Sequence, residues 1–335
     1  MSASGLPTPH SSGRIHGGPD AQGAPRYDFS TNSNACGPCP QALAAVQAAD
    51  ATRYPDSSYT VLRDALAAFH GVDAWRIVLA GSASEFIFRI TAWTAQQGGR
   101  TVHLPAHAYG DYAHAATAWG VSAVADADAA ALVWACEPSS PQGQAHGPWP
   151  KNVGKVVLDS AYAPLRLSGS PSLSAAQRDA LWQLFSPNKA LGLTGVRAAY
   201  AIAPRGAEAA AQQLEALASS WPVGAHGVAM LLAWTQADCQ SWLQASLQTL
   251  AGWKQRQVAL LQGAGWTVQP SDTPFFCARP PAGVDAVALC AALRAQGIKL
   301  RDATSFGLPG WVRLGVLSPQ AQDALHLALK VLKEA

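Results

Sequence analysis

Charged residues are scarce in this sequence, and it has no long apolar run. Only 13% of its 335 residues are Asp, Glu, Lys or Arg, and the formal net charge is +2. A balance so near neutrality gives no reason to expect a nucleic-acid or membrane partner. Without an uninterrupted apolar stretch of about 18 residues, a transmembrane helix is not expected. Residues 1–25 lack the apolar middle of a secretory signal, so we expect a cytoplasmic protein.

Cysteine is also sparse, and six residues in a chain of this length exclude a disulfide-built scaffold. Cys36 and Cys39 form a CxxC, a spacing that can serve a redox pair or half of a zinc site. A zinc site needs four clustered ligands. No second CxxC follows, and the other cysteines are scattered. We therefore expect plain thiols and no metal.

Apolar residues, in contrast, make up 49% of the chain, with 29 Gly and 23 Pro. This composition is typical of a compact, loop-rich protein, and the length favours two domains. Apolar residues at helical spacing occupy 58–70, before the stop signal Gly71. Short apolar runs that predict buried strands alternate with helical stretches, at 76–80, 101–104, 131–135, 156–158 and 198–202.

Strands separated by helices predict a mostly parallel sheet covered on both faces, and so an α/β protein. Segments 267–279 and 299–316 predict a separate small sheet, and 319–333 predicts a closing amphipathic helix. We therefore divide the chain into three ranges. These are an N-terminal arm with part of the small domain at 1–40, a large domain at 41–235 and a C-terminal small domain at 236–335.

The segment SPNKALGLTGVR, residues 186–197, is the most informative one. Lys189 follows the hydroxyl of Ser186 and precedes a glycine-rich stretch that ends at Arg197. A lysine amine can bind a phosphorylated aldehyde covalently while the hydroxyl and the guanidinium hold its anionic group. Glycines let the backbone pass close to such a ligand. The pattern resembles the cofactor-lysine signature of the class I/II aminotransferases, which use pyridoxal 5′-phosphate (PLP).

This resemblance implies the fold of aspartate aminotransferase (PLP fold type I), with a mostly parallel seven-stranded sheet in the large domain and a smaller α+β domain. It also assigns three residues to the cofactor ring. Asp159, at the end of a predicted strand, pairs with the pyridine nitrogen and keeps the ring an electron sink. Tyr162 meets the ring's 3-oxygen, and Tyr109 stacks on the ring face.

The resemblance further assigns the residues that bind the cofactor phosphate. Ser82, Ala83 and Ser84 follow a predicted strand and open a helix, where free backbone N–H groups can cradle a phosphate. Ser186 and Arg197 close the other half of this cup.

Three more residues gain a role from the resemblance. Arg313 lies where a family arginine grips the substrate α-carboxylate in a bidentate pair, and Arg301 could bind a second anion. Tyr54 stands in an RYPD element whose tyrosine reaches the cofactor phosphate of a second subunit. A homodimer with shared active sites, acting on a small amino acid substrate, is therefore expected.

The resemblance is best for the branch that holds histidinol-phosphate aminotransferase and L-threonine-O-3-phosphate decarboxylase. An HGG element at His16 and a DFSTN element ending at Asn32 look like the start of the decarboxylase, and both residues are expected at the substrate. We therefore prefer the decarboxylase, with the aminotransferase as the alternative and a non-catalytic binding protein as a third possibility. In one departure, Ser140 replaces the asparagine that normally bonds the ring 3-oxygen, which leaves more of that contact to Tyr162 or to water.

Overall fold

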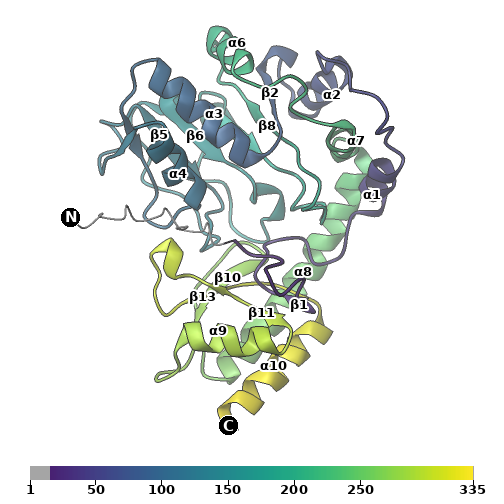
Figure 1. Cartoon of the computed structure of the whole chain (residues 1–335), viewed down its shortest axis with the longest axis vertical. Coiled ribbons are helices and arrows are strands. Elements are labelled where there is room, and N and C mark those ends of the chain that lie inside the picture. The colour runs from purple at the N-terminus through teal and green to yellow at the C-terminus, as the bar shows by residue number, and fades with distance from the viewer. Residues whose placement is uncertain (1–15, 335) are drawn as a thin grey trace, which may run out of the picture.

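The larger part of the molecule is built on a seven-stranded sheet (Figure 1). The computed structural model describes residues 16–334. The strands are β2 Ile77–Ala80, β3 Thr101–His103, β4 Ser122–Ala123, β5 Leu132–Cys136, β6 Val156–Asp159, β7 Trp182–Phe185 and β8 Ala199–Ile202. They stand in the order β2-β8-β7-β6-β5-β3-β4, and β8 alone runs opposite to the other six. The predicted mostly parallel sheet of seven strands is confirmed.

Helices cover both faces of this sheet. They are α1 Pro40–Gln47, α2 Thr60–His70, α3 Ala83–Gln96, α4 Gly110–Ala118, α6 Glu208–Ala216 and α7 Ala225–Trp234. The short α5 Ala175–Arg178 precedes β7 and has no buried residue. Ile77 and Leu79 of β2 pack into one core with α1, α2 and α7, whereas Val78 and Ala80 pack into another with α3, α4 and α6. Consecutive strand residues point to opposite faces, so burial of both faces makes the whole strand apolar.

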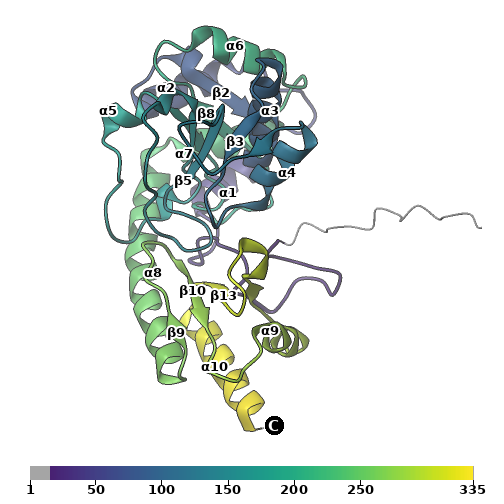
Figure 2. The same ribbon diagram turned by 90° about the vertical axis from the view of Figure 1, so that its left-hand side faces the viewer.

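A smaller antiparallel sheet lies on the C-terminal side (Figure 2). Its strands are β9 Thr267–Val268, β10 Phe275–Arg279, β12 Arg301–Asp302 and β13 Val312–Gly315, in the order β12-β13-β10-β9. The helices α8 Ala237–Gly263, α9 Ala286–Ala295 and α10 Pro319–Glu334 contribute to its core. Figure 2 shows α8 running from the larger part down along the smaller one.

The N-terminal segment joins the smaller part in space, because β1 Tyr27–Asp28 pairs in parallel with β11 Ile298–Lys299. The division at residues 40 and 235 stays a prediction, and residues 1–15 of its first range lie outside the described residues. Within residues 16–334, no helix is both long enough and apolar enough to cross a membrane.

Two strands of the large sheet, β4 and β7, are missing from the sequence prediction. The polar Gln183 interrupts β7, and only Trp182 and Leu184 of this strand are fully buried. Four residues with one polar member give too short a pattern to separate from a loop. This strand matters for function, because it leads directly into the segment of Lys189.

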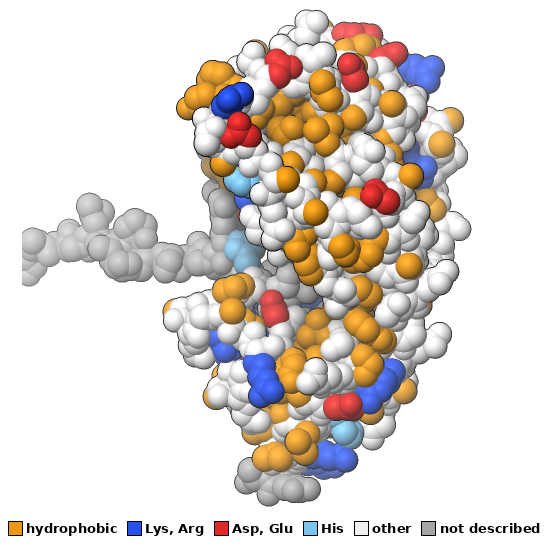
Figure 3. Space-filling model, turned by 90° about the vertical axis from the view of Figure 1, so that its right-hand side faces the viewer, with side chains coloured by type: hydrophobic (Ala, Val, Ile, Leu, Met, Phe, Trp, Pro, Cys, Tyr) orange, Lys and Arg blue, Asp and Glu red, His pale blue; other side chains and the backbone are white. Residues whose placement is uncertain are grey.

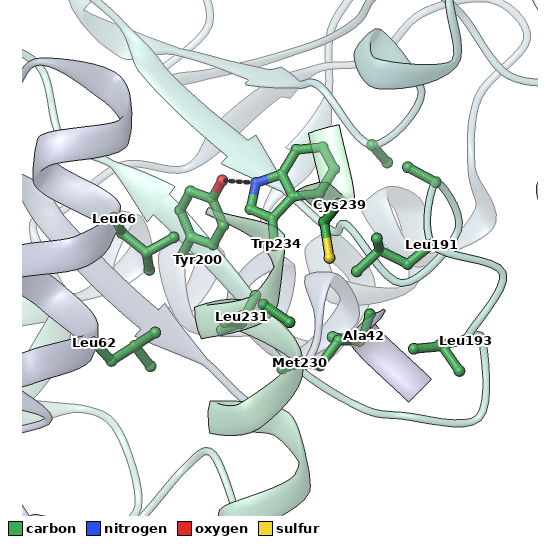
Figure 4. Packing of buried hydrophobic residues seen from close by; sticks show 14 of the residues in the cluster. Ala42, Leu62, Leu66, Leu191, Leu193, Tyr200, Met230, Leu231, Trp234 and Cys239 are labelled. Atoms are coloured by element: carbon green, nitrogen blue, oxygen red, sulfur yellow. Dashed lines mark hydrogen bonds between the residues drawn. The ribbon is translucent and has the colours of Figure 1, made fainter. Parts of the chain in front are cut away.

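The chain after Lys189 is fixed by a buried apolar cluster (Figure 4). Leu191 and Leu193 pack there with Ala42 of α1 and Met230 of α7. Two backbone bonds hold the same stretch from the N-terminal side: Asn34 N–H donates to Lys189 O at 2.9 Å, and Cys39 N–H donates to Leu191 O at 2.8 Å. Packing and backbone bonds together set the direction in which Lys189 leaves the loop.

Replacing Gly192 by alanine is expected to destabilise this loop by about 2 kcal/mol, because a non-glycine residue is strained at its φ of +69° and the added Cβ would lie 2.5 Å from Gly37 O. Urea unfolding measures the effect. Gly195→Ala is the matched control, since no heavy atom lies within 4 Å of its added Cβ; a change within about 0.5 kcal/mol is expected there. Equal stability of the two variants would contradict the close approach at Gly192.

Candidate active site

A cavity of about 950 Å³ lies at the edge of the large sheet where its parallel strands end. In open α/β sheets, ligands bind at this edge. The smaller part contributes to the wall, and histidine side chains lie at the indentation between the two parts (Figure 3). Fourteen predicted site residues line the cavity: His16, Asn32, Ser82, Ala83, Ser84, Tyr109, Ser140, Asp159, Tyr162, Ser186, Lys189, Arg197, Arg301 and Arg313.

Lys189 carries its amine into this cavity from the loop that follows β7. Its Nζ donates to Ser186 Oγ at 3.1 Å, and it forms no ion pair with any residue in the described range. Burial lowers the pKa of Lys189, and the nearby charge of Asp159 opposes this shift only in part. An amine with a lowered pKa spends more time neutral, the form that attacks an aldehyde or accepts a proton.

Asp159 ends β6 and is 5% exposed. Its Oδ1 accepts from Ala161 N–H at 2.9 Å, and its Oδ2 accepts from the Tyr112 hydroxyl at 2.7 Å. Burial raises the pKa of the carboxyl, whereas the two hydrogen bonds and the charge of Lys189 lower it. The sequence predicted Asp159, but gave Tyr112 no role, since nothing in its spacing indicates a partner 47 residues away.

The residues of the predicted phosphate cup line the cavity from two parts of the chain. Ser82 is the N-cap of α3, and its Oγ accepts from Glu85 N–H at 3.0 Å. Ala83 and Ser84 follow in the first turn, where backbone N–H groups lack helical partners and favour an anion. Ser186 and Arg197 line the cavity from the loop after β7.

Tyr109 lies between this cup and the N-terminal segment. Its hydroxyl is 3.1 Å from Ser84 Oγ, and its ring centroid is 6.1 Å from that of His16. Burial raises the pKa of Tyr109, so the phenol stays protonated at neutral pH. Its ring is thus held at the cavity wall by contacts on two sides.

The N-terminal segment is tied to the smaller part by Asp20, which accepts from Arg294 Nη2 at 2.7 Å and lies 2.9 Å from Lys299 Nζ. The Arg294 hydrogen bond is the main cause of a lowered Asp20 pKa. Lys299 Nζ also donates to Gly18 O at 2.6 Å. These contacts carry His16 and Gly17 to the cavity wall, which a sequence pattern alone could not locate.

Two arginines from the smaller part meet on one phenyl ring. The guanidinium carbons of Arg301 and Arg313 lie 4.7 and 5.3 Å from the Phe306 ring centroid. Burial is the main cause of a lowered pKa in both arginines. Repulsion by Arg313 adds to the shift of Arg301, whose pKa falls to about 10. Adjacent buried cations favour an anionic ligand, because its charge offsets both their repulsion and their desolvation.

Arg313 is anchored only by neutral groups among the described residues: its Nη2 donates to Ser30 O at 2.8 Å and its Nη1 donates to Ser140 Oγ at 3.3 Å. Its buried Nε has no partner among them. Ser140 therefore contacts an arginine as well as the cavity. Asn32 donates to the Tyr162 hydroxyl at 3.4 Å, and its buried Oδ1 is also without a partner in the described range. These orphaned atoms indicate where a polar ligand would bind.

Tyr54 alone among the predicted site residues lies away from the cavity of its own chain. It is 77% exposed and stacks on Trp221 with ring centroids 4.4 Å apart. Its role in a second subunit stays a prediction.

The CxxC cysteines are free thiols, and Cys39 Sγ lies 3.6 Å from Cys239 Sγ rather than near Cys36.

Solved structures with the same fold are aminotransferases and a decarboxylase. A histidinol-phosphate aminotransferase from Clostridium acetobutylicum has a TM-score of 0.77 at 20% identity, over 92% of this chain and 99% of that one. L-threonine-O-3-phosphate decarboxylase from Porphyromonas gingivalis has a TM-score of 0.75 at 20% identity, with the same coverage of both chains. The predicted PLP fold type I is confirmed.

Sequence comparison then identifies the family. The model of aminotransferase class I and II matches residues 25–329, so the chain belongs to this family. A histidinol-phosphate aminotransferase from Thermobifida fusca is 30% identical, over 90% of this chain and 88% of its own. Another from Jannaschia sp. is 26% identical, over 92% and 91%. The family is PLP-dependent, so the predicted cofactor and enzyme class are confirmed.

The residues of the cavity fit PLP. A volume of about 950 Å³ is large enough for a small ligand and a cofactor together. A buried acid, a lysine without an ion pair in the described range and an anion cradle at a helix N-terminus lie around this one space. Each matches a different chemical group of the cofactor: the pyridine nitrogen, the aldehyde and the phosphate.

Proposed function

We propose that this protein is an aminotransferase that moves an amino group between a small anionic amine of the histidinol-phosphate type and a 2-oxo acid. The observation that carries the proposal is the presence of Lys189, Asp159 and the Arg301–Arg313 pair around one cavity. The names of the relatives at 26% and 30% identity favour the same reaction. They support this alternative better than the decarboxylase that we preferred from the sequence.

PLP, when bound, supplies an aldehyde that joins to amines and a protonated pyridine ring that draws electrons from the bonds at Cα. In our proposal, Lys189 would bind the cofactor covalently and, once released, would move a proton from the substrate Cα to the cofactor carbon that carried the aldehyde. Asp159 holds the proton on the pyridine nitrogen. Tyr162 binds the ring oxygen, and Tyr109 covers one ring face.

The remaining residues would bind the anionic groups of the cofactor and of the substrates. Ser82, Ala83, Ser84, Ser186 and Arg197 would bind the cofactor phosphate. Arg313 and Arg301 would bind the phosphate of the amine and, in the other half-reaction, a carboxylate of the oxo acid. Because a planar guanidinium bonds a carboxylate or a phosphate in the same fork geometry, one pair can serve both substrates.

A threonine-phosphate decarboxylase is the second candidate. It is favoured by the position of His16 and Gly17 at the cavity wall, since the HGG element resembles that enzyme. In a decarboxylase, the substrate loses its carboxylate instead of the Cα proton. The arginines would then have to hold the substrate with the bond from Cα to the carboxylate perpendicular to the cofactor ring.

One assay separates the two reactions. With PLP and 2-oxoglutarate supplied, we expect glutamate to form from histidinol phosphate, and kcat/KM to fall about a hundredfold for histidinol, which lacks the phosphate that the arginines bind. Threonine phosphate without any oxo acid serves as the comparison. Carbon dioxide release in that reaction, with no turnover of histidinol phosphate, would replace the aminotransferase by the decarboxylase.

A further inference from the structure

The Asp159 carboxylate has a second residue behind it that the functional assignment does not use. Tyr112 lies in the first turn of α4, is fully buried and donates its hydroxyl to Asp159 Oδ2 at 2.7 Å. The same turn of chain presents Tyr109 to the cavity. One helix start therefore supplies both a ring at the cavity wall and a hydrogen bond to the acid.

The ring of Tyr112 has little freedom to move. It stacks on Trp134 of β5, with centroids 4.4 Å apart and planes within 8°, and it meets the Tyr109 ring edge-on at 5.9 Å. Trp134 is itself fully buried. A hydroxyl on such a fixed ring determines where its acceptor lies, because a hydrogen bond weakens steeply when the geometry changes.

The hydrogen bond from Tyr112 is important because the Asp159 carboxylate carries a charge in a buried position. Within residues 16–334, four titratable groups face Asp159: Tyr112 from α4, Cys136 from β5, Lys189 from the loop after β7 and Tyr162 from its own segment. Burial raises the pKa of Tyr112 and of Cys136, so both stay neutral at neutral pH. Besides the Ala161 N–H, the Tyr112 hydroxyl is therefore the neutral donor that stabilises the ionised acid in a desolvated position.

We propose that Tyr112 is a positioning residue that keeps Asp159 ionised and aimed at the pyridine nitrogen of the cofactor. It acts through Asp159, and its own side chain also lines the cavity. The inference rests on the function proposed for Asp159. It goes beyond that function by assigning the protonation state of the acid to a residue of another helix.

Tyr112→Phe removes the hydroxyl and retains the ring that stacks on Trp134. The affinity of the apoprotein for PLP, measured by equilibrium dialysis, is expected to fall roughly 10- to 100-fold. This is the range for loss of a hydrogen bond to a charged group. The carboxyl becomes harder to ionise without its donor. The acid-side pH at which PLP affinity is lost should therefore rise by about one unit.

Tyr200→Phe is the matched control. Tyr200 is also fully buried, and its hydroxyl lies 2.8 Å from His70 Nε2 and accepts from Trp234 Nε1 at 3.2 Å, outside the cavity. Both variants lose one buried hydroxyl and some thermal stability. Only Tyr112→Phe should shift the pH midpoint.

A double-variant test decides whether Tyr112 acts through the acid. In an Asp159→Asn background, adding Tyr112→Phe should change PLP affinity less than twofold. Wild-type affinity and an unshifted midpoint in Tyr112→Phe would overturn the proposal, as would a full additive loss in the Asn background. If the Phe variant does not fold, Tyr112→His replaces it, because a histidine can still donate a hydrogen bond to Asp159. The PLP affinity of this variant must then lie within tenfold of the wild-type affinity. Failure of the wild-type protein to bind PLP would overturn the proposed function instead.

Discussion

Replacing Arg313 by lysine is expected to raise the KM for the anionic substrate by about a hundredfold, with a smaller change in kcat. Arg313 is 7% exposed, and its guanidinium is held in place by Ser30 O and Ser140 Oγ. A lysine ammonium keeps the charge but lacks the planar fork that matches phosphate or carboxylate, and it cannot keep both anchoring bonds while it reaches a ligand. Steady-state kinetics at fixed oxo acid concentration measures the effect.

Arg279→Lys provides a matched control. Arg279 belongs to β10 of the same small sheet, and its guanidinium carbon lies 4.6 Å from the Trp311 ring centroid, but it does not line the cavity. We expect KM to change less than twofold there. An unchanged KM in Arg313→Lys, or an equal rise in both variants, would remove Arg313 from the substrate site.

Replacing Lys189 by alanine is expected to abolish covalent PLP binding and to lower the rate by at least about a thousandfold, because one amine serves as both attachment point and base. The purified variant should lack the long-wavelength absorbance of the wild-type protein. Its fold should be retained, since Leu191 and Leu193 hold the loop independently of the lysine side chain.

Lys254→Ala tests whether any lysine with a lowered pKa would give the same result. Burial lowers the pKa of Lys254 to about 8, but this residue lies on α8, outside the cavity, and donates to Ser271 O. Its variant should keep both the absorbance and the rate. Retained colour and turnover in Lys189→Ala would show that another amine carries the cofactor.

The sequence was sufficient for the strands that are apolar on both faces and for bringing the candidate site residues of local motifs to one cavity. Ile77–Ala80 and residues 156–158 are readable because two-sided burial makes them continuous apolar runs. Asp159 ends such a strand, so its neighbours in sequence place it at the edge of the sheet. Lys189 follows β7, which the sequence did not reveal, and was predicted from its motif alone.

Other features depend on contacts between distant segments and left no local signal. The Tyr112–Asp159 bond requires that α4 and β6 be brought together by the sheet order. The sharing of Phe306 by two arginines depends on the antiparallel register of β12 and β13, in which Arg301 stands opposite Arg313. The place of His16 follows from ion pairs of Asp20 with Arg294 and Lys299.

Borohydride reduction of the PLP-loaded protein, followed by tryptic mass mapping, tests the central claim most directly. Trypsin does not cleave after a modified lysine, so reduction should yield peptide 179–197 with Lys189 intact and the mass of one reduced cofactor added. The other six lysines of the chain should be unmodified. A cofactor fixed to one of those six, or no adduct in a protein that transfers amino groups with PLP, would contradict the assignment of Lys189.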